Sequence, residues 1–134
     1  MKKLALLALA MFIGIATFAQ SQEKEIVEIY YFHRTDRCAT CNAIEESLIK
    51  TIEKNYKKDV EKGRLIFKSI NFETETGSDL VKKYEIESPT LLIIYNNKGE
   101  KKLTDLTEEA FEFARNNPSK FKKILTSKIN DCFR

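Results

Sequence analysis

The chain has 134 residues, a length typical of one globular domain built around a single hydrophobic core. Hydrophobic residues make up 43% and charged residues 32%, with four glycines and two prolines, which excludes a disordered or collagen-like chain. Basic residues number 23 and acidic residues 20, so the net charge of +3 is too small to indicate a nucleic-acid partner.

The N-terminus has the pattern of a secretory signal peptide. Lys2 and Lys3 precede an uncharged, mainly apolar run from Leu4 to Phe18, and polar residues follow Ala19. The run is shorter than the roughly 20 residues that a spanning helix needs, so we expect cleavage near Ala19, with an uncleaved membrane anchor as the alternative. The predicted domain, residues 20–134, would be periplasmic or secreted, with a net charge near +1 and no membrane attachment.

The first half of the domain predicts a strand, a helix and a second strand. Residues Ile26–Phe32 are β-branched and aromatic with one charge, which is typical of a strand buried on both faces. From Cys41 to Tyr56 apolar residues recur at helical spacing, and Leu65–Phe72 again has the pattern of a strand. These three segments predict a parallel βαβ unit with a helix that begins at a Cys-x-x-Cys motif.

The second half contains shorter elements bounded by turn and capping residues. Asn96–Gly99 tolerates positive φ and predicts a hairpin, and Asn117 followed by Pro118 is typical of a helix start. The predicted elements are a helix from Ser78 to Tyr84, a buried strand from Thr90 to Tyr95, an edge strand from Glu100 to Leu103, and helices that begin at Thr107 and Pro118. The expected architecture is α/β, with a mixed four-stranded sheet and helices on both faces.

Three cysteines carry the candidate chemistry: Cys38, Cys41 and Cys132. An odd number excludes complete pairing within one chain, and Cys38 and Cys41 are too close in sequence to form a useful structural cross-link. At a helix start, free N–H groups and the helix dipole stabilise a thiolate, so Cys38 is the predicted nucleophile. Cys41 lies one turn further on and is the predicted resolving thiol, which would attack a mixed disulfide formed on Cys38.

Two features near the motif leave alternatives open. A Cys-x-x-Cys pair also occurs in zinc sites, but typical structural sites combine two such pairs, and here only His33 and the distant Cys132 remain. Arg34 and Arg37 would lower the pKa of Cys38 if they lay near its sulfur, whereas Asp36 would raise it.

The chain resembles the thioredoxin superfamily over essentially the whole predicted domain. The resemblance rests on the strand Ile26–Phe32, the motif Cys38-Ala39-Thr40-Cys41 and the turn Ser88-Pro89-Thr90. The strings Tyr30–His33 and Arg37–Asn42 more narrowly resemble the small exported family labelled nitrophenyl compound nitroreductase subunit, found in bacterial arsenic-resistance gene neighbourhoods.

The superfamily resemblance implies a cis peptide bond before Pro89 and a substrate-binding turn, Ser88, Pro89 and Thr90, whose Ser88 backbone pairs with an extended partner segment. A trans proline that starts a strand is the alternative. The chain departs from the thioredoxin pattern at Arg37, which replaces the usual tryptophan, at Ala39-Thr40, which replaces Gly-Pro, and at Phe32, which replaces a buried carboxylate. His33 is the nearest titratable group, and we interpret it as a structural residue.

Three functions fit this sequence. The first is a monomeric thiol-disulfide oxidoreductase or two-electron carrier whose partner is a protein thiol or disulfide, a membrane electron donor being one candidate. The second is a protein that binds a soft metal or trivalent arsenic through Cys38 and Cys41, either alone or with Cys132 as a third ligand. Cys132 is otherwise interpreted as an inert thiol near the chain end or as the site of an intermolecular disulfide. The third is a non-catalytic accessory subunit of a reductase system. Since no G-x-G-x-x-G motif is present, we expect no cofactor other than the Cys38–Cys41 disulfide.

Overall fold

A computed structural model describes residues 24–74 and 78–134, so the predicted signal peptide lies outside the described residues. The elements are β1 (Ile26–His33), α1 (Ala39–Asn55), α2 (Lys57–Glu61), β2 (Leu65–Asn71), α3 (Ser78–Lys83), β3 (Thr90–Asn97), β4 (Glu100–Asp105), α4 (Thr107–Phe113) and α5 (Pro118–Cys132). Within the described ranges, no helix has the length and apolar character needed to cross a membrane.

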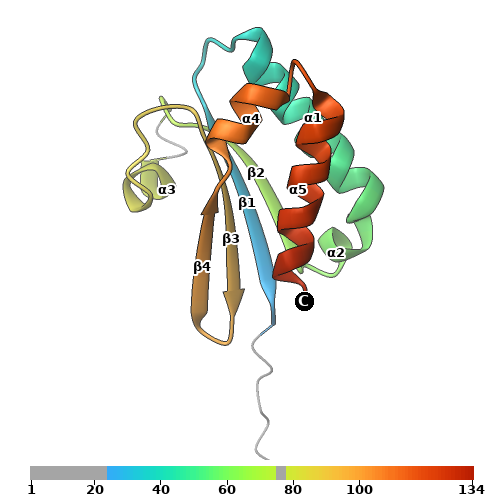
Figure 1. The fold of residues 1–134 in the computed structure, drawn as a ribbon. Helices are drawn as coiled ribbons and strands as arrows, with labels where there is room; N and C mark the ends of the chain where they lie inside the picture. Colours follow the sequence, from blue (N-terminus) through green and yellow to red (C-terminus); the bar gives the residue numbers. More distant parts are fainter. Residues whose placement is uncertain (1–23, 75–77) are drawn as a thin grey trace, which may run out of the picture.

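The four strands form one mixed sheet in the order β2-β1-β3-β4 (Figure 1). β1 runs parallel to β2 and antiparallel to β3, and β4 returns antiparallel along β3. Tyr31 in the centre of β1 lies opposite Ser69 on one side and Leu91 on the other. The predicted α/β architecture with a mixed four-stranded sheet is therefore confirmed.

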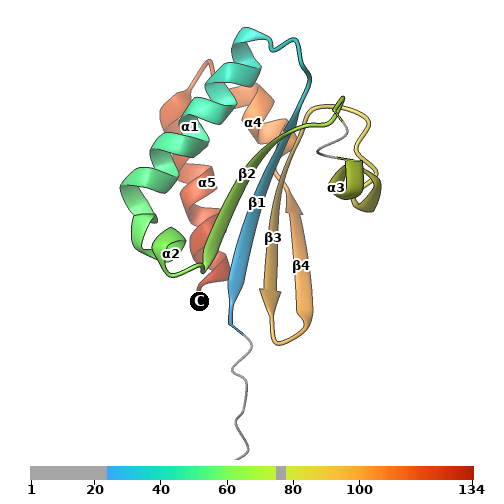
Figure 2. The same ribbon diagram turned by 180° about the vertical axis from the view of Figure 1, so that it is seen from behind.

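Helices cover both faces of this sheet, but unequally. The larger core lies between the sheet and the helices α1, α4 and α5, and contains Tyr31, Leu48 and Phe121 (Figures 1 and 2). The smaller core contains Tyr30 and Phe32, against which the short helix α3 packs. Successive side chains of a strand point to opposite faces, and helices cover both faces of this sheet. The side chains of β1 are therefore buried almost throughout, which explains its continuous apolar sequence.

Most element boundaries follow from local sequence chemistry. Lys98 (φ 50°) and Gly99 (φ 83°) both adopt positive φ in the turn between β3 and β4, as a tight hairpin turn requires. The side chain of Asn117 accepts a hydrogen bond from the N–H of Lys120 at 3.1 Å, and Pro118 occupies the first turn of α5. The short helix α2 was not predicted, because its five residues, Lys57–Glu61, contain no buried side chain that would give it an apolar period.

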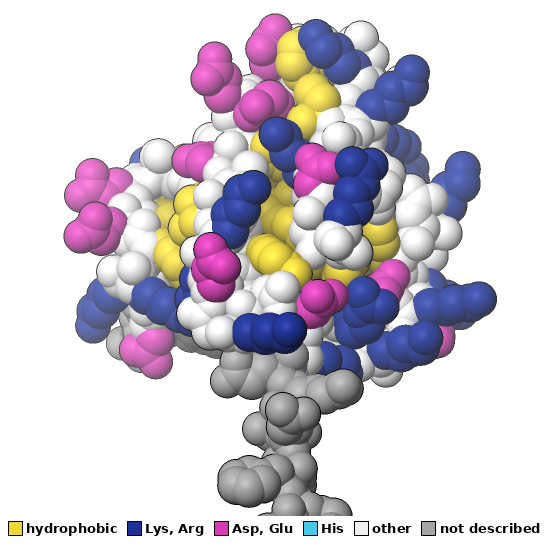
Figure 3. Space-filling view, turned by 60° about the horizontal axis from the view of Figure 1, so that its bottom comes forward, with side chains coloured by type: hydrophobic (Ala, Val, Ile, Leu, Met, Phe, Trp, Pro, Cys, Tyr) yellow, Lys and Arg dark blue, Asp and Glu magenta, His cyan; other side chains and the backbone are white. Residues whose placement is uncertain are grey.

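Figure 3 views the molecule from the end where α5 stops and β3 turns into β4. Lysine and arginine side chains are interspersed with acidic ones, and apolar side chains remain visible between them near the centre. This face thus carries charges of both signs rather than one basic patch.

Candidate active site

The candidate site lies where β1 ends and α1 begins. Cys38 is the N-cap residue of α1, in an extended conformation with φ −75° and ψ 164°. Its sulfur accepts a hydrogen bond from the backbone N–H of Cys41 at 3.1 Å, and its carbonyl oxygen accepts one from the N–H of Asn42 at 3.1 Å. The thiol therefore takes the place that a serine or aspartate side chain usually has at a helix start.

The two cysteines of the motif differ in their exposure to solvent. Cys38 is exposed, whereas Cys41 is 7% exposed and lies on the same helix face as the buried Ile44 and Leu48. This follows from the helical period, which places positions 41, 44 and 48 on one side of α1. The Cys38 thiol can therefore contact a partner protein, whereas the Cys41 thiol is shielded from solvent.

The pKa values of the two thiols shift in opposite directions. The pKa of Cys38 is lowered, first by the hydrogen bond that the Cys41 thiol donates to its sulfur and then by hydrogen bonds from backbone N–H groups at the helix start. The pKa of Cys41 is raised, first by burial and then by the same contact with Cys38. Cys38 is thus the thiol that ionises first.

The arginines near the motif bind carboxylates. The guanidinium of Arg37 forms an ion pair with Glu45 of α1 and also contacts the ring of His33. Arg34 pairs with Glu73 at 3.5 Å. The lowered pKa of Cys38 therefore arises from hydrogen bonds at the helix start, and neither the two arginines nor Asp36, whose net effect the sequence left open, is among its causes.

Two residues of β1 that were not predicted as part of the site contact the backbone around the cysteine motif. The hydroxyl of Tyr31 donates a hydrogen bond to the carbonyl oxygen of Cys41 at 3.1 Å. His33 is 6% exposed, and its Nδ1 lies 2.8 Å from the carbonyl oxygen of Arg34. Alternation along β1 places Tyr31 and His33 on one face, which is the signal that could have identified them.

The loop before Cys38 is fixed to the end of β2. A carboxylate oxygen of Glu73 accepts a hydrogen bond from the N–H of Thr35 at 2.9 Å, and this bond is the main reason that the pKa of Glu73 is lowered. The side-chain amide of Asn71 donates to the hydroxyl of Thr35 at 3.0 Å. These contacts connect residues far apart in sequence and hold the chain that leads into Cys38.

The predicted substrate-binding turn lies at the same end of the sheet as the motif, since Thr90 pairs with Phe32 near the end of β1. Ser88 is exposed, and its carbonyl oxygen accepts a hydrogen bond from the Thr90 hydroxyl at 2.8 Å. The expected cis bond before Pro89 is not found, because the described residues contain no cis peptide. Pro89 is a trans proline just before β3, the isomer that X-Pro bonds favour by about 0.5–1 kcal/mol.

Cys132 does not join the other two thiols. It is the last residue of α5, near Tyr56 at the far end of α1, and its thiol donates to the carbonyl oxygen of Lys128 at 3.3 Å. The 17 residues of α1 separate it from Cys38 by about 25 Å. The three-cysteine metal site is therefore wrong, and no cluster of three or more metal-ligating side chains occurs among the residues described.

The difference between the thiol pKa values predicts an order of alkylation. As pH rises, the thiolate forms first on the group with the lower pKa, so Cys38 should react with iodoacetamide at lower pH than Cys41. Burial raises the pKa of Cys132 and should delay its reaction as well. Mass spectrometry of peptides from the reduced protein would measure all three rates. Modification of Cys41 before Cys38 would contradict the assignment.

No family model matches the chain, and no curated protein matches its sequence. Among solved structures, a chain described as a malarial protein is 19% identical with a TM-score of 0.42, over 63% of this chain and 88% of its own. A thioredoxin from Thermus thermophilus, determined in solution, is 17% identical with a TM-score of 0.46, over 78% of this chain and 74% of its own. Both identities lie below 25% and both TM-scores below 0.5, so neither similarity assigns a function to this chain.

Proposed function

We propose that the protein is an exported thiol-disulfide oxidoreductase or two-electron carrier that acts, as a monomer, on a protein disulfide or dithiol. The observation that carries the proposal is the pairing of an exposed Cys38, with a lowered pKa at the start of α1, with a buried Cys41 hydrogen-bonded to it. Nucleophilic attack needs a thiolate that a partner can reach, and release needs a second thiol close enough to attack the Cys38 sulfur.

The proposed reaction moves two electrons in two exchange steps. The Cys38 thiolate attacks one sulfur of the partner disulfide, so that a Cys38–partner bond forms and the other partner sulfur leaves as a thiolate. Cys41 then loses its proton to water or to the departing thiolate, attacks the Cys38 sulfur and breaks the mixed disulfide. The partner leaves as a dithiol and the protein retains a Cys38–Cys41 disulfide; oxidation of a partner dithiol is the reverse sequence.

The turn at Ser88 would position the partner. Ser88 is exposed and precedes β3, at the end of the sheet where the motif lies. An extended partner segment could pair with the Ser88 backbone while its sulfur meets Cys38. The apolar N-terminal run and the likeness of residues 30–42 to the small exported nitrophenyl compound nitroreductase subunits support an extracytoplasmic setting.

The reduction potential of the Cys38/Cys41 pair tests this proposal. Hydrogen bonds to the Cys38 sulfur stabilise the reduced form, which shifts the potential in the oxidising direction, so we expect a value above that of a dithiol whose thiol pKa values are unshifted. The measurement uses the Cys132→Ser variant, equilibrated in glutathione or dithiothreitol buffers of defined potential, with alkylation of free thiols. A pair that forms no reversible disulfide would overturn the proposal and favour soft-metal binding or a docking role.

A further inference from the structure

A buried tyrosine of β1 lies next to the Cys41 thiol. Tyr31 is 0% exposed, and its hydroxyl donates a hydrogen bond to the carbonyl oxygen of Cys41 at 3.1 Å. The same hydroxyl also interacts with the Cys41 side chain, and this hydrogen bond lowers the pKa of the thiol against the larger, opposite effect of burial. Phe32, the next residue of β1, points into the smaller core on the other face of the sheet. Tyr31 thus brings a hydroxyl group to the predicted resolving thiol.

The hydroxyl of Tyr31 remains protonated near neutral pH. Burial raises its pKa and the neighbouring Cys41 raises it further, whereas the charge of Arg37 lowers it by less. A phenol with a raised pKa keeps its proton and acts as a hydrogen-bond donor. It is therefore unsuited to deprotonate Cys41, but it can stabilise the Cys41 thiolate once that thiolate has formed.

The other titratable and charged groups around Cys41 are already engaged. The guanidinium of Arg37 forms an ion pair with Glu45 and contacts the ring of His33. In the part of the chain that the structure describes, the helices α4 and α5 bury only apolar side chains against α1. Cys38 is bonded to the partner in the mixed disulfide, so it carries no charge when Cys41 ionises. A hydrogen bond from Tyr31 is thus the stabilisation that the site offers to this thiolate.

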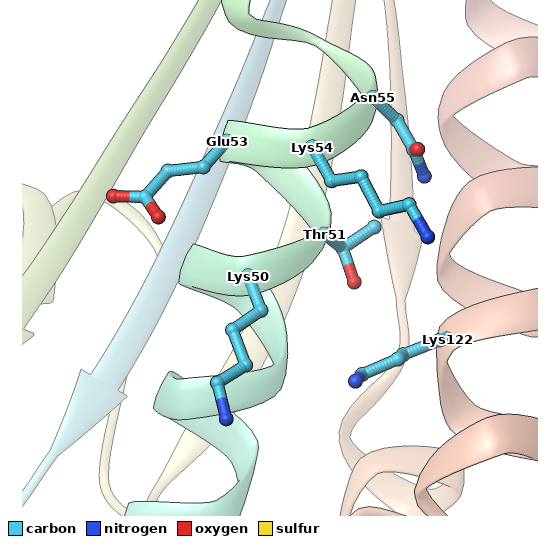
Figure 4. Close-up of a pocket in the computed structure, with 6 residues that line it drawn as sticks. All are labelled: Lys50, Thr51, Glu53, Lys54, Asn55 and Lys122. Carbon is cyan, nitrogen blue, oxygen red and sulfur yellow. The ribbon is translucent and has the colours of Figure 1, made fainter.

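The lysines of α1 lie too far along the helix to take this role. Figure 4 shows Lys50, Thr51 and Lys54 at a hollow between α1 and α5, which Lys122 lines from α5. Thr51 follows Cys41 by ten residues, which places it about 15 Å away along the helix axis. A hydrogen bond to the Cys41 sulfur requires a donor within a few ångströms, so these ammonium groups make none.

We propose that Tyr31 stabilises the Cys41 thiolate during release of the partner, by turning its hydroxyl hydrogen from the carbonyl oxygen of Cys41 to the sulfur. The inference rests on the proposed function, whose second step needs this thiolate. Both acceptors belong to one residue, so rotation about the C–O bond of the tyrosine redirects the hydrogen bond. Cys41 gives its proton to water or to the departing thiolate, and Tyr31 keeps its own. As Cys41 attacks Cys38, the negative charge passes to the sulfur of the partner.

Reaction of the reduced Cys132→Ser protein with dithiobis(nitrobenzoate), an aromatic disulfide, separates the two steps. Attack by Cys38 releases a first coloured thiolate, and attack by Cys41 on the mixed disulfide releases a second. Stopped-flow absorbance follows both phases in one trace. Cys41→Ser in the same background should release only the first thiolate, which assigns the phases.

Tyr31→Phe keeps the buried ring, removes the hydroxyl and should slow the second phase. Loss of a hydrogen bond to a charged group lowers the thiolate population roughly ten- to hundredfold, but the less stabilised thiolate is more nucleophilic and recovers about half of this loss on a logarithmic scale. Near neutral pH we therefore expect a second phase roughly three- to tenfold slower and a first phase changed by no more than about twofold. Above the pKa of Cys41 the difference should disappear or reverse, because Cys41 is then ionised in both proteins.

Tyr30→Phe is the matched control. Tyr30 is 3% exposed, and its hydroxyl donates to Glu28 at 2.7 Å on the opposite face of β1. The variant removes the same atom from the adjacent residue and should leave both phases and their pH dependence unchanged. NMR titration of the Cys41 Cβ atom in isotope-labelled protein gives a second readout. The pKa of Cys41 should be higher in Tyr31→Phe than in the parent, and unchanged in Tyr30→Phe.

The outcomes distinguish this inference from the proposed function. An unchanged second phase in Tyr31→Phe, with both phases present in the parent, would overturn the role of Tyr31 and leave the proposed function intact. A second phase slowed equally at every pH, or equally slowed in Tyr30→Phe, would show an effect on packing and would also overturn it. A parent protein that releases only the first thiolate would overturn the proposed function and this inference together.

Discussion

Replacement of Cys38 by serine is expected to slow the reduction of a protein disulfide by roughly a thousandfold or more, because a serine hydroxyl supplies no thiolate nucleophile. Serine is a favoured N-cap residue, so it can accept the hydrogen bond from the N–H of Cys41 and maintain the start of α1. The loss would thus reflect chemistry rather than unfolding. Turnover of insulin disulfides with dithiothreitol as reductant would measure it.

Two further variants distinguish the roles of the cysteines. Cys41→Ser should accumulate a mixed disulfide on Cys38, visible as a covalent adduct on a non-reducing gel, because the resolving thiol is absent. Cys132→Ser should retain the parent rate, since Cys132 lies at the opposite end of α1. A Cys38→Ser protein with undiminished turnover would contradict the proposed reaction and favour a docking subunit.

Phe121→Ala is expected to lower the free energy of unfolding by about 3–5 kcal/mol, the usual cost of removing a fully buried phenyl ring. Phe121 is 0% exposed and belongs to the core between the sheet and the helices α1, α4 and α5. The truncation leaves a cavity that its well-packed neighbours can fill only in part. Urea denaturation followed by circular dichroism would measure the change.

Ile49→Ala on α1 serves as the control for this experiment. Ile49 is 39% exposed, so its truncation should change the stability by no more than about 0.5 kcal/mol. The contrast between the two positions tests the placement of α5 on the sheet, because Phe121 is buried only through that packing. A loss of less than 1 kcal/mol in Phe121→Ala would show that α5 does not cover this core.

Much of the fold could be predicted because its elements depend on neighbouring residues. The apolar run Ile26–Phe32 belongs to a strand covered on both faces, and Lys98–Gly99 forms the tight turn that its positive φ values allow. The Cys38–Cys41 spacing likewise placed both thiols at one helix start, because a helix brings positions three apart onto one side.

Other features depend on contacts between segments distant in sequence, and these could not be predicted. Arg34 forms its ion pair with Glu73. Thr35 is hydrogen-bonded to Asn71, the last residue of β2, and to Glu73 just beyond it. The resemblance of the Ser88-Pro89-Thr90 turn to the thioredoxin superfamily predicts a cis bond before Pro89. The bond is trans, the isomer that X-Pro peptides intrinsically favour.

The first strand, the capped helix and the cysteine pair follow from local chemistry, because backbone geometry and side chains within a few residues specify each of them. Two other features depend on contacts between distant segments: Cys132 lies far from Cys38, and Thr51 and Lys122 line the same hollow. Both depend on how α5 packs along α1, and that packing is set by the combined burial of many apolar side chains from separate elements.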